Sequence, residues 1–131
     1  MANNSSISIH QHVLWLAICI YHEARGEPKE GQIAVAHVIM NRVRERDKSV
    51  EQIVLQPFQF SWANNNRRPP IKNYAALSEC LDSAMVCLSE RMQGVDFDGA
   101  NHYFADSIRP PVWASKMRKI GKIGAHVFYR G

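Results

Sequence analysis

Cysteine is scarce in this sequence, and its three copies, Cys19, Cys80 and Cys87, are widely spaced. An odd number without close spacing argues against a disulfide framework and against a zinc site. Each cysteine lies among apolar residues of an expected helix. We therefore predict buried, reduced thiols and folding in a reducing compartment such as the cytoplasm.

Several signatures of catalysis are also missing. His22-Glu23 begins an H-E-x-x-H zinc motif, but Gly26 stands where the second histidine is needed. No G-x-S-x-G motif occurs, and the glycines are too few for a phosphate-binding loop. The six histidines are scattered, and only His102 and His126 are candidates for adjacency, across two strands. We therefore expect no metal ion and no cofactor.

The sequence also lacks a long hydrophobic run. The apolar segment from Val13 to Tyr21 is too short to span a membrane, and no basic region precedes it. We expect no secretory signal and no stable membrane anchor. The protein would then be made in the cytoplasm, and a substrate outside it would require another route of delivery.

The composition is that of a globular protein with a basic charge balance. The 131 residues are 46% apolar, which predicts a single domain over residues 1–131, with a loose polar segment at 1–8. We expect a monomer. The net charge of +4 favours an anionic partner, such as nucleic acid, a membrane surface or a cell-wall polymer.

The hydrophobic pattern predicts a helical body with a small β element, which is an α+β fold. Ser49 begins a capping-box pattern, Asn73 is suited to cap a long helix, and Gly94 is suited to end it. The expected elements are helices at about 9–24, 28–46, 49–56 and 73–93, a short strand at 101–105, an extended connection at 109–113 and a closing strand at 123–129.

The end of the first helix concentrates charge. An apolar helix delivers His22, Glu23, Arg25 and Glu27 within six residues, and Gly26 favours a helix end because it tolerates the left-handed conformation. From composition alone, a solvated turn between helices is the commoner arrangement. The alternative is a carboxyl group set in a partly apolar wall, where its pKa would rise.

General acid catalysis is the chemistry that these residues fit. Glycosidic cleavage needs a carboxylic acid that stays protonated near neutral pH. Glu23 meets this need best, because it ends an apolar helix. Glu27 lies beside Pro28 and close to Lys29, so we expect it to be more solvated and to act in support.

Three ordered blocks of sequence add a family resemblance. Residues 22–43 contain H-E-A-R-G-E-P, G-Q-I-A-V and V-I-M-N-R-V, residues 59–61 read Q-F-S, and residues 102–129 contain H-Y-F, W-A and I-G. Together they resemble the cell-wall hydrolases of the spore-cortex-lytic enzyme type, the SleB-like catalytic domain. The resemblance runs over nearly the whole chain.

The resemblance implies a fold, an activity and a set of site residues. The fold would be lysozyme- or lytic-transglycosylase-like, and the substrate a peptidoglycan glycan strand cut between N-acetylmuramic acid and N-acetylglucosamine. A lytic transglycosylase needs one carboxyl group, because the sugar's own 6-hydroxyl closes an anhydro ring; muramidase and amidase activities stay open as alternatives. The implied acid is Glu23, supported by Glu27, and the implied substrate-binding residues are Gln59, Ser61, Tyr103, Trp113 and His126.

The sequence departs from the family pattern in two respects. It shows neither a secretion signal nor a separate wall-binding domain, and it lacks the Phe-Pro pair that the family carries between the positions of Arg46 and Ile53. A bare, basic catalytic domain without a signal resembles a phage endolysin, which is released through holes made by a holin.

Nucleic-acid binding is the alternative from a different class of function. Basic residues at 42, 44, 46, 48, 67 and 68, together with Trp62, would suit a small nucleic-acid-binding protein. That interpretation leaves the three family blocks unexplained, so we expect no nucleic-acid partner.

Overall fold

A computed structural model describes residues 9–56, 60–66 and 69–131. Predictions that concern Gln59, Arg67 and Arg68 therefore lie outside the described residues. The elements, in chain order, are α1 (Ile9–Ala24), α2 (Lys29–Arg46), α3 (Val50–Leu55), η2 (Ser61–Asn66), α4 (Tyr74–Met92), η3 (Phe97–Gly99), β1 (His102–Ala105), η4 (Val112–Lys116), β2 (Arg118–Ile123) and β3 (His126–Arg130).

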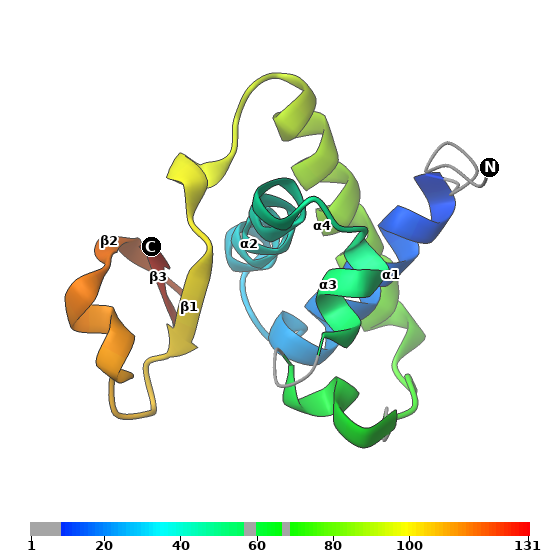
Figure 1. The fold of residues 1–131 in the computed structure, drawn as a ribbon. Helices are drawn as coiled ribbons and strands as arrows, with labels where there is room; N and C mark the ends of the chain where they lie inside the picture. The colour runs from blue at the N-terminus through cyan, green and yellow to red at the C-terminus, as the bar shows by residue number, and fades with distance from the viewer. Residues whose placement is uncertain (1–8, 57–59, 67–68) are drawn as a thin grey trace.

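Helix α2 is the central element of the molecule. In Figure 1 the three-stranded sheet lies on one side of α2, and α1, α3 and α4 lie on the other. Helix α1 packs against α2, α3 and α4, and α2 also packs against η3 and β1. The core contains the fully buried side chains of Leu16, Ile20, Val35, Ile39 and Phe128. This arrangement confirms the predicted α+β class, with a helical body and a small sheet.

Local capping signals place three of the helix ends. Ser49 and Gln52 form the predicted capping box, with Ser49 Oγ accepting from the Gln52 amide at 3.1 Å. Asn73 Oδ1 accepts from the Ala76 amide at 2.9 Å and so caps α4. Gly94 has φ of +85°, the left-handed conformation expected just after that helix.

The end of α1 is built differently from the prediction. Gly26 does not have a positive φ. Buried Gln32 instead reaches back from α2, and its Nε2 donates to the carbonyls of Arg25 at 3.3 Å and Glu27 at 3.5 Å. Ser83 Oγ of α4 donates to the other end of the same side-chain amide, Gln32 Oε1, at 2.7 Å. The Gln32 side chain of α2 thus satisfies carbonyl groups that follow α1, so the end of α1 does not require a left-handed glycine.

The sheet is antiparallel, in the order β1-β3-β2. The single closing strand predicted at 123–129 is wrong, because two strands meet there. Ile123 pairs with His126 across a two-residue turn, Gly124 and Ala125. Gly124 has φ of +56°, which favours glycine, and the apolar alternation on either side hid this turn. The predicted extended connection at 109–113 also ends early, since η4 begins at Val112.

None of the helices in the described part of the chain is both long enough and apolar enough to cross a membrane. The three cysteines are free and buried, as predicted.

Candidate active site

Glu23 lies in the last turn of α1, where the helix faces the sheet. The Tyr103 hydroxyl, carried on β1, donates a hydrogen bond to Glu23 Oε1. The two residues are 80 positions apart in the chain, so the sheet must dock on the helices before they can meet. The structure thus brings together the predicted acid and one of the predicted substrate-binding residues.

The surroundings of Glu23 favour the protonated acid. Burial raises the pKa of Glu23, while the Tyr103 hydrogen bond and the positive charge of Arg42 lower it in part, and the net pKa is raised. Burial and the charge of Glu23 also raise the pKa of Tyr103 well above its usual range, so its hydroxyl keeps the proton that it donates. Because Oε1 accepts from Tyr103, the acidic proton of Glu23 belongs on Oε2.

Arg42 is a buried cation beside this pair, whereas the alternative nucleic-acid-binding patch would need it at the surface. Its residue surface is only 8% exposed. Its Nε donates to the Asn101 carbonyl at 2.9 Å, and its guanidinium lies 5.9 Å from the centre of the Phe60 ring. The patch interpretation is therefore wrong for Arg42. The available signal was the N-R pair of the first sequence block, residues 22–43, which contains Arg42.

Glu27 faces the β2–β3 turn. Its Oε1 accepts from the Ala125 amide at 2.7 Å and lies 3.4 Å from His126 Nδ1. The side chain is only 17% exposed, so Glu27 is itself largely buried, and its greater solvation relative to Glu23 stays a prediction. A Cβ on Gly124 would approach Glu27 Oε1 to 2.6 Å, which shows how closely the turn fits this carboxylate.

His126 lies between Tyr103, which contacts Glu23, and the carboxylate of Glu27. Its ring meets that of Tyr103 edge to face, with centroids 5.1 Å apart, and its Nδ1 faces Glu27. Burial lowers the pKa of His126, against the opposing charges of Glu27 and Asp106, so the ring is mainly neutral at pH 7. His102 does not join it, because His102 pairs with Tyr129 while His126 pairs with Ala105.

The segment around Ser61 lies beside the acid. Ser61 is exposed at the start of η2, and the next residue, Trp62, stacks on His22 with ring centroids 4.3 Å apart. His22 immediately precedes Glu23. Phe60 and Trp62 are themselves buried, so these two aromatic side chains belong to the core. Gln59 lies outside the described residues.

Trp113 lies on the opposite face of the sheet from Tyr103. Its ring contacts those of His102, Phe104 and Tyr129, with centroids 5.1, 5.9 and 5.4 Å away. Side chains alternate between the two faces of a strand, so His102 and Phe104 point away from the face that carries Tyr103. The structure therefore does not bring Trp113 to Glu23.

No group of three or more histidine, cysteine, aspartate or glutamate side chains is arranged to hold a metal ion within residues 9–56, 60–66 and 69–131. The chemistry available at the site is that of a carboxyl group with a raised pKa, a phenol hydroxyl and a buried guanidinium.

Comparison with known proteins identifies the family of this chain. The family model for cell wall hydrolases matches residues 26–129, and the chain belongs to that family. The match begins three residues after Glu23, so the role of Glu23 is argued from its surroundings.

Curated relatives extend the comparison. The spore cortex-lytic enzyme of Bacillus subtilis (strain 168) is 32% identical over 116 residues, which cover 86% of this chain and 35% of the relative. That of Oceanobacillus iheyensis is 31% identical over 116 residues, covering 86% of this chain and 39% of the relative. The chain thus spans less than half the length of these relatives.

Solved structures match over most of the chain. The catalytic domain of the germination-specific lytic transglycosylase SleB from Bacillus anthracis has a TM-score of 0.68 at 30% identity, covering 91% of this chain and 93% of that one. The catalytic domain of the Bacillus cereus SleB protein also has a TM-score of 0.68 at 30% identity, covering 91% and 89%. The expected SleB-like fold is confirmed.

Proposed function

We propose that this chain cleaves the glycan strands of peptidoglycan as a lytic transglycosylase, with Glu23 as its general acid. The observation that carries the proposal is the state of Glu23: a carboxyl group whose pKa burial raises, fixed by the hydroxyl of Tyr103. The similarity to the catalytic domain of a lytic transglycosylase supports the same reaction.

The first step is protonation of the leaving group. Glu23 Oε2 gives its proton to the oxygen between N-acetylmuramic acid and N-acetylglucosamine, and the bond from that oxygen to C1 of the muramic acid breaks. Positive charge develops at C1 as the leaving sugar departs with its new hydroxyl. The positive charge of Arg42 stabilises the carboxylate that Glu23 becomes, in line with its lowering of the Glu23 pKa.

The second step closes the ring. The Glu23 carboxylate takes the proton of the muramic acid 6-hydroxyl while that oxygen bonds to C1, which yields a 1,6-anhydro end and restores the acid. One carboxyl group is enough for both steps. Three other carboxylates each have a partner already: Glu27 contacts Ala125, Asp96 contacts Arg44 and Asp106 contacts Lys122.

The remaining site residues take supporting parts in this proposal. Glu27 fixes the β2–β3 turn and supports Glu23 through the position of the sheet, and His126 holds the Tyr103 ring. Ser61, exposed beside the His22–Trp62 stack, lines the substrate groove. Substrate contacts by Gln59 and Trp113 stay predictions.

The delivery route is part of the same proposal. The domain acts on the wall after release from the cytoplasm, as a monomer and with the help of a holin. Expression in a bacterial host with and without a holin tests this: lysis should require the holin, and lysis without it would contradict the route.

The test of the reaction is digestion of purified sacculi with mass spectrometry of the products. Glu23→Gln should lower the rate by about a hundredfold or more, the size of a general-acid contribution. Glu30→Gln, an exposed glutamate on α2, is the matched control and should keep full activity.

The products separate the activities. Anhydromuramic ends support the proposal. Reducing muramic ends would indicate a muramidase, and freed stem peptides an amidase. A folded Glu23→Gln variant with full activity would remove Glu23 from its role.

A further inference from the structure

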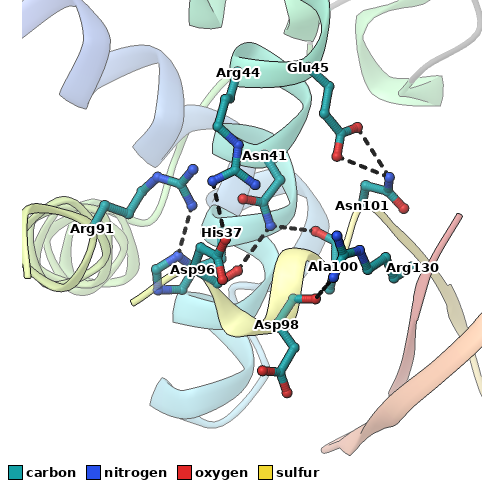
Figure 2. A network of polar contacts seen from close by, with 10 residues as sticks. All are labelled: His37, Asn41, Arg44, Glu45, Arg91, Asp96, Asp98, Ala100, Asn101 and Arg130. Carbon is teal, nitrogen blue, oxygen red and sulfur yellow. Dashed lines mark hydrogen bonds and ion pairs between the residues drawn. The ribbon is translucent and has the colours of Figure 1, made fainter. Parts of the chain in front are cut away.

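The last turns of α2 hold the beginning of β1 by three side chains. Asn41 Nδ2 donates to the Ala100 carbonyl at 2.7 Å, and Arg42 Nε donates to the Asn101 carbonyl at 2.9 Å. Both Glu45 carboxylate oxygens accept from Asn101 Nδ2, at 3.1 and 3.2 Å. Figure 2 shows the contacts of Asn41 with Ala100 and of Glu45 with Asn101. We call Asn41, Arg42 and Glu45 the β1 clamp.

Asn101, the residue that the clamp holds, is fixed by its other polar groups as well. Its amide donates to the Tyr129 carbonyl at 3.0 Å. Its side-chain oxygen accepts from the Gly131 amide at 2.8 Å, and its Nδ2 also donates to the Gly131 carbonyl at 3.0 Å. Asn101 therefore joins α2, the end of β3 and the start of β1 at one point.

Asn41 of the β1 clamp also bridges a stretch of backbone with positive φ values. Phe97, Asp98 and Gly99 have φ values of +53°, +54° and +74°, a conformation that costs free energy in residues other than glycine. Asn41 Nδ2 bonds the Asp96 carbonyl at 3.0 Å as well as that of Ala100, so one side chain bridges the whole stretch. Figure 2 shows both bonds of Asn41. The backbone enters β1 in a fixed direction because both ends of this stretch are tied to α2.

Tyr103 lies on β1, two residues after Asn101, which immediately precedes the strand and continues its pairing by donating to the Tyr129 carbonyl. Residues two apart on a strand point to the same face and lie about 6–7 Å apart, so displacement of one is passed to the other. Within the part of the chain that the structure describes, β1 is an edge strand, paired with β3 alone. Its position against the helices therefore depends on what α2 holds.

We propose that Asn41, Arg42 and Glu45 are positioning residues, which set the hydroxyl of Tyr103 on Glu23. The expected effect on catalysis rests on the proposed function. The placement of Tyr103 by these three residues rests on the geometry of β1 alone. The competing interpretation is that the three side chains only stabilise the fold. If the clamp positions Tyr103, its loss should change the pKa of Glu23 only while the Tyr103 hydroxyl is present. If it only stabilises the fold, the change should not depend on Tyr103.

The test is a double-mutant cycle read by NMR titration of the Glu23 carboxyl carbon, which needs no substrate. Glu45 is exposed, so Glu45→Ala should fold. It should shift the Glu23 titration to higher pH, as Tyr103→Phe should also do, because the Tyr103 hydrogen bond lowers the pKa of Glu23. In the Tyr103→Phe background, Glu45→Ala should cause no further upward shift.

Two variants control for charge and shape. Asp47→Asn removes a neighbouring exposed negative charge and suits the left-handed backbone at that position, so it reports the effect of charge alone and should leave activity unchanged. Glu45→Gln keeps an oxygen that accepts from Asn101 Nδ2. It should restore most of the wild-type titration once the effect of charge is subtracted.

Activity gives a second readout. Glu45→Ala should lower the rate at saturating sacculi by about tenfold, since small misplacements of catalytic groups are costly, and leave the half-saturating amount unchanged. An unshifted Glu23 titration, or the same upward shift in both Tyr103 backgrounds, would overturn the positioning role. Sacculi left intact by the wild-type protein would overturn the proposed function instead, while the NMR cycle still decides the role of the clamp.

Discussion

The Tyr103 hydroxyl donates its hydrogen bond to a carboxyl group whose pKa is already raised by burial. The two effects on Glu23 oppose each other. Burial favours the neutral acid, and the phenol favours the carboxylate. Tyr103 therefore sets how far the acid stays protonated as the pH rises, in addition to fixing its direction.

Replacement of Tyr103 should change the pH profile of the reaction. In Tyr103→Phe the pKa of Glu23 rises, because the hydrogen bond that lowers it is lost. The alkaline limb of the rate at saturating sacculi should move to higher pH, while the maximal rate falls about tenfold from poorer orientation. Tyr74→Phe is the control, since Tyr74 is 74% exposed. An alkaline limb that stays in place in Tyr103→Phe would contradict this account.

Glu23 should cost the protein stability at neutral pH. Its pKa in the folded state lies above the ordinary value of 4.5, so between these two values the folded state binds more protons than the unfolded state. The free energy of unfolding then falls as the pH rises from the lower value through the higher one. Glu23→Gln removes this cost and keeps an oxygen that accepts from Tyr103.

The measurement is urea unfolding of both proteins across pH. Glu23→Gln should be more stable by about 1 kcal/mol at neutral pH, a gain typical of relieving a functional site. The gain should shrink at acid pH, where the wild-type carboxyl group is protonated in both states. A gain that grows toward acid pH would show that the pKa of Glu23 is lowered by folding.

The turn held by Glu27 should be sensitive to a single methyl group. Gly124 has φ of +56°, and a Cβ there would meet Glu27 Oε1 at 2.6 Å and Pro28 Cδ at 2.9 Å. Gly124→Ala should lower the free energy of unfolding by about 1–3 kcal/mol, from backbone strain and the displaced carboxylate. Gly121→Ala, in β2, is the control, because its Cβ would meet nothing within 4 Å. Equal losses in the two variants would contradict the close fit at Gly124.

The cysteines should be unreactive in the folded protein. Burial raises the pKa of Cys80 to about 11 and that of Cys87 to about 12, and raises that of Cys19 well above its usual range. A thiol reagent at pH 8 should therefore modify none of them until denaturant is added, and then all three. Modification of one cysteine under native conditions would show that its helix opens locally.

Local signals in the sequence predicted most of the helical body. The cap at Asn73 and the capping box at Ser49 depend on residues three apart, so they are visible without the fold. The placement of Glu23 at the end of an apolar helix was visible for the same reason. Tyr103 entered only through the family resemblance, because no local pattern links it to a residue 80 positions away.

Apart from the missed turn at Gly124 and the early start of η4, the differences from the prediction come from contacts with other elements of the fold. Arg42 and Glu27 carry charges that normally lie in water, and their burial depends on Asn101 and Ala125, which the sheet supplies. The end of α1 also depends on another helix, since Gln32 of α2 donates to the Arg25 carbonyl. In each case a tertiary contact overrode the usual preference of the residue.

The distance in sequence between Glu23 and Tyr103 also orders events during folding. The helix that carries Glu23 can form from local contacts, whereas the bond to Tyr103 requires closure of a long loop and docking of the C-terminal strands, which are slower steps. A partly folded molecule can therefore hold the acid on a formed helix with no working site around it. A wall-degrading enzyme built in this way is inert until its chain has folded to the last strand.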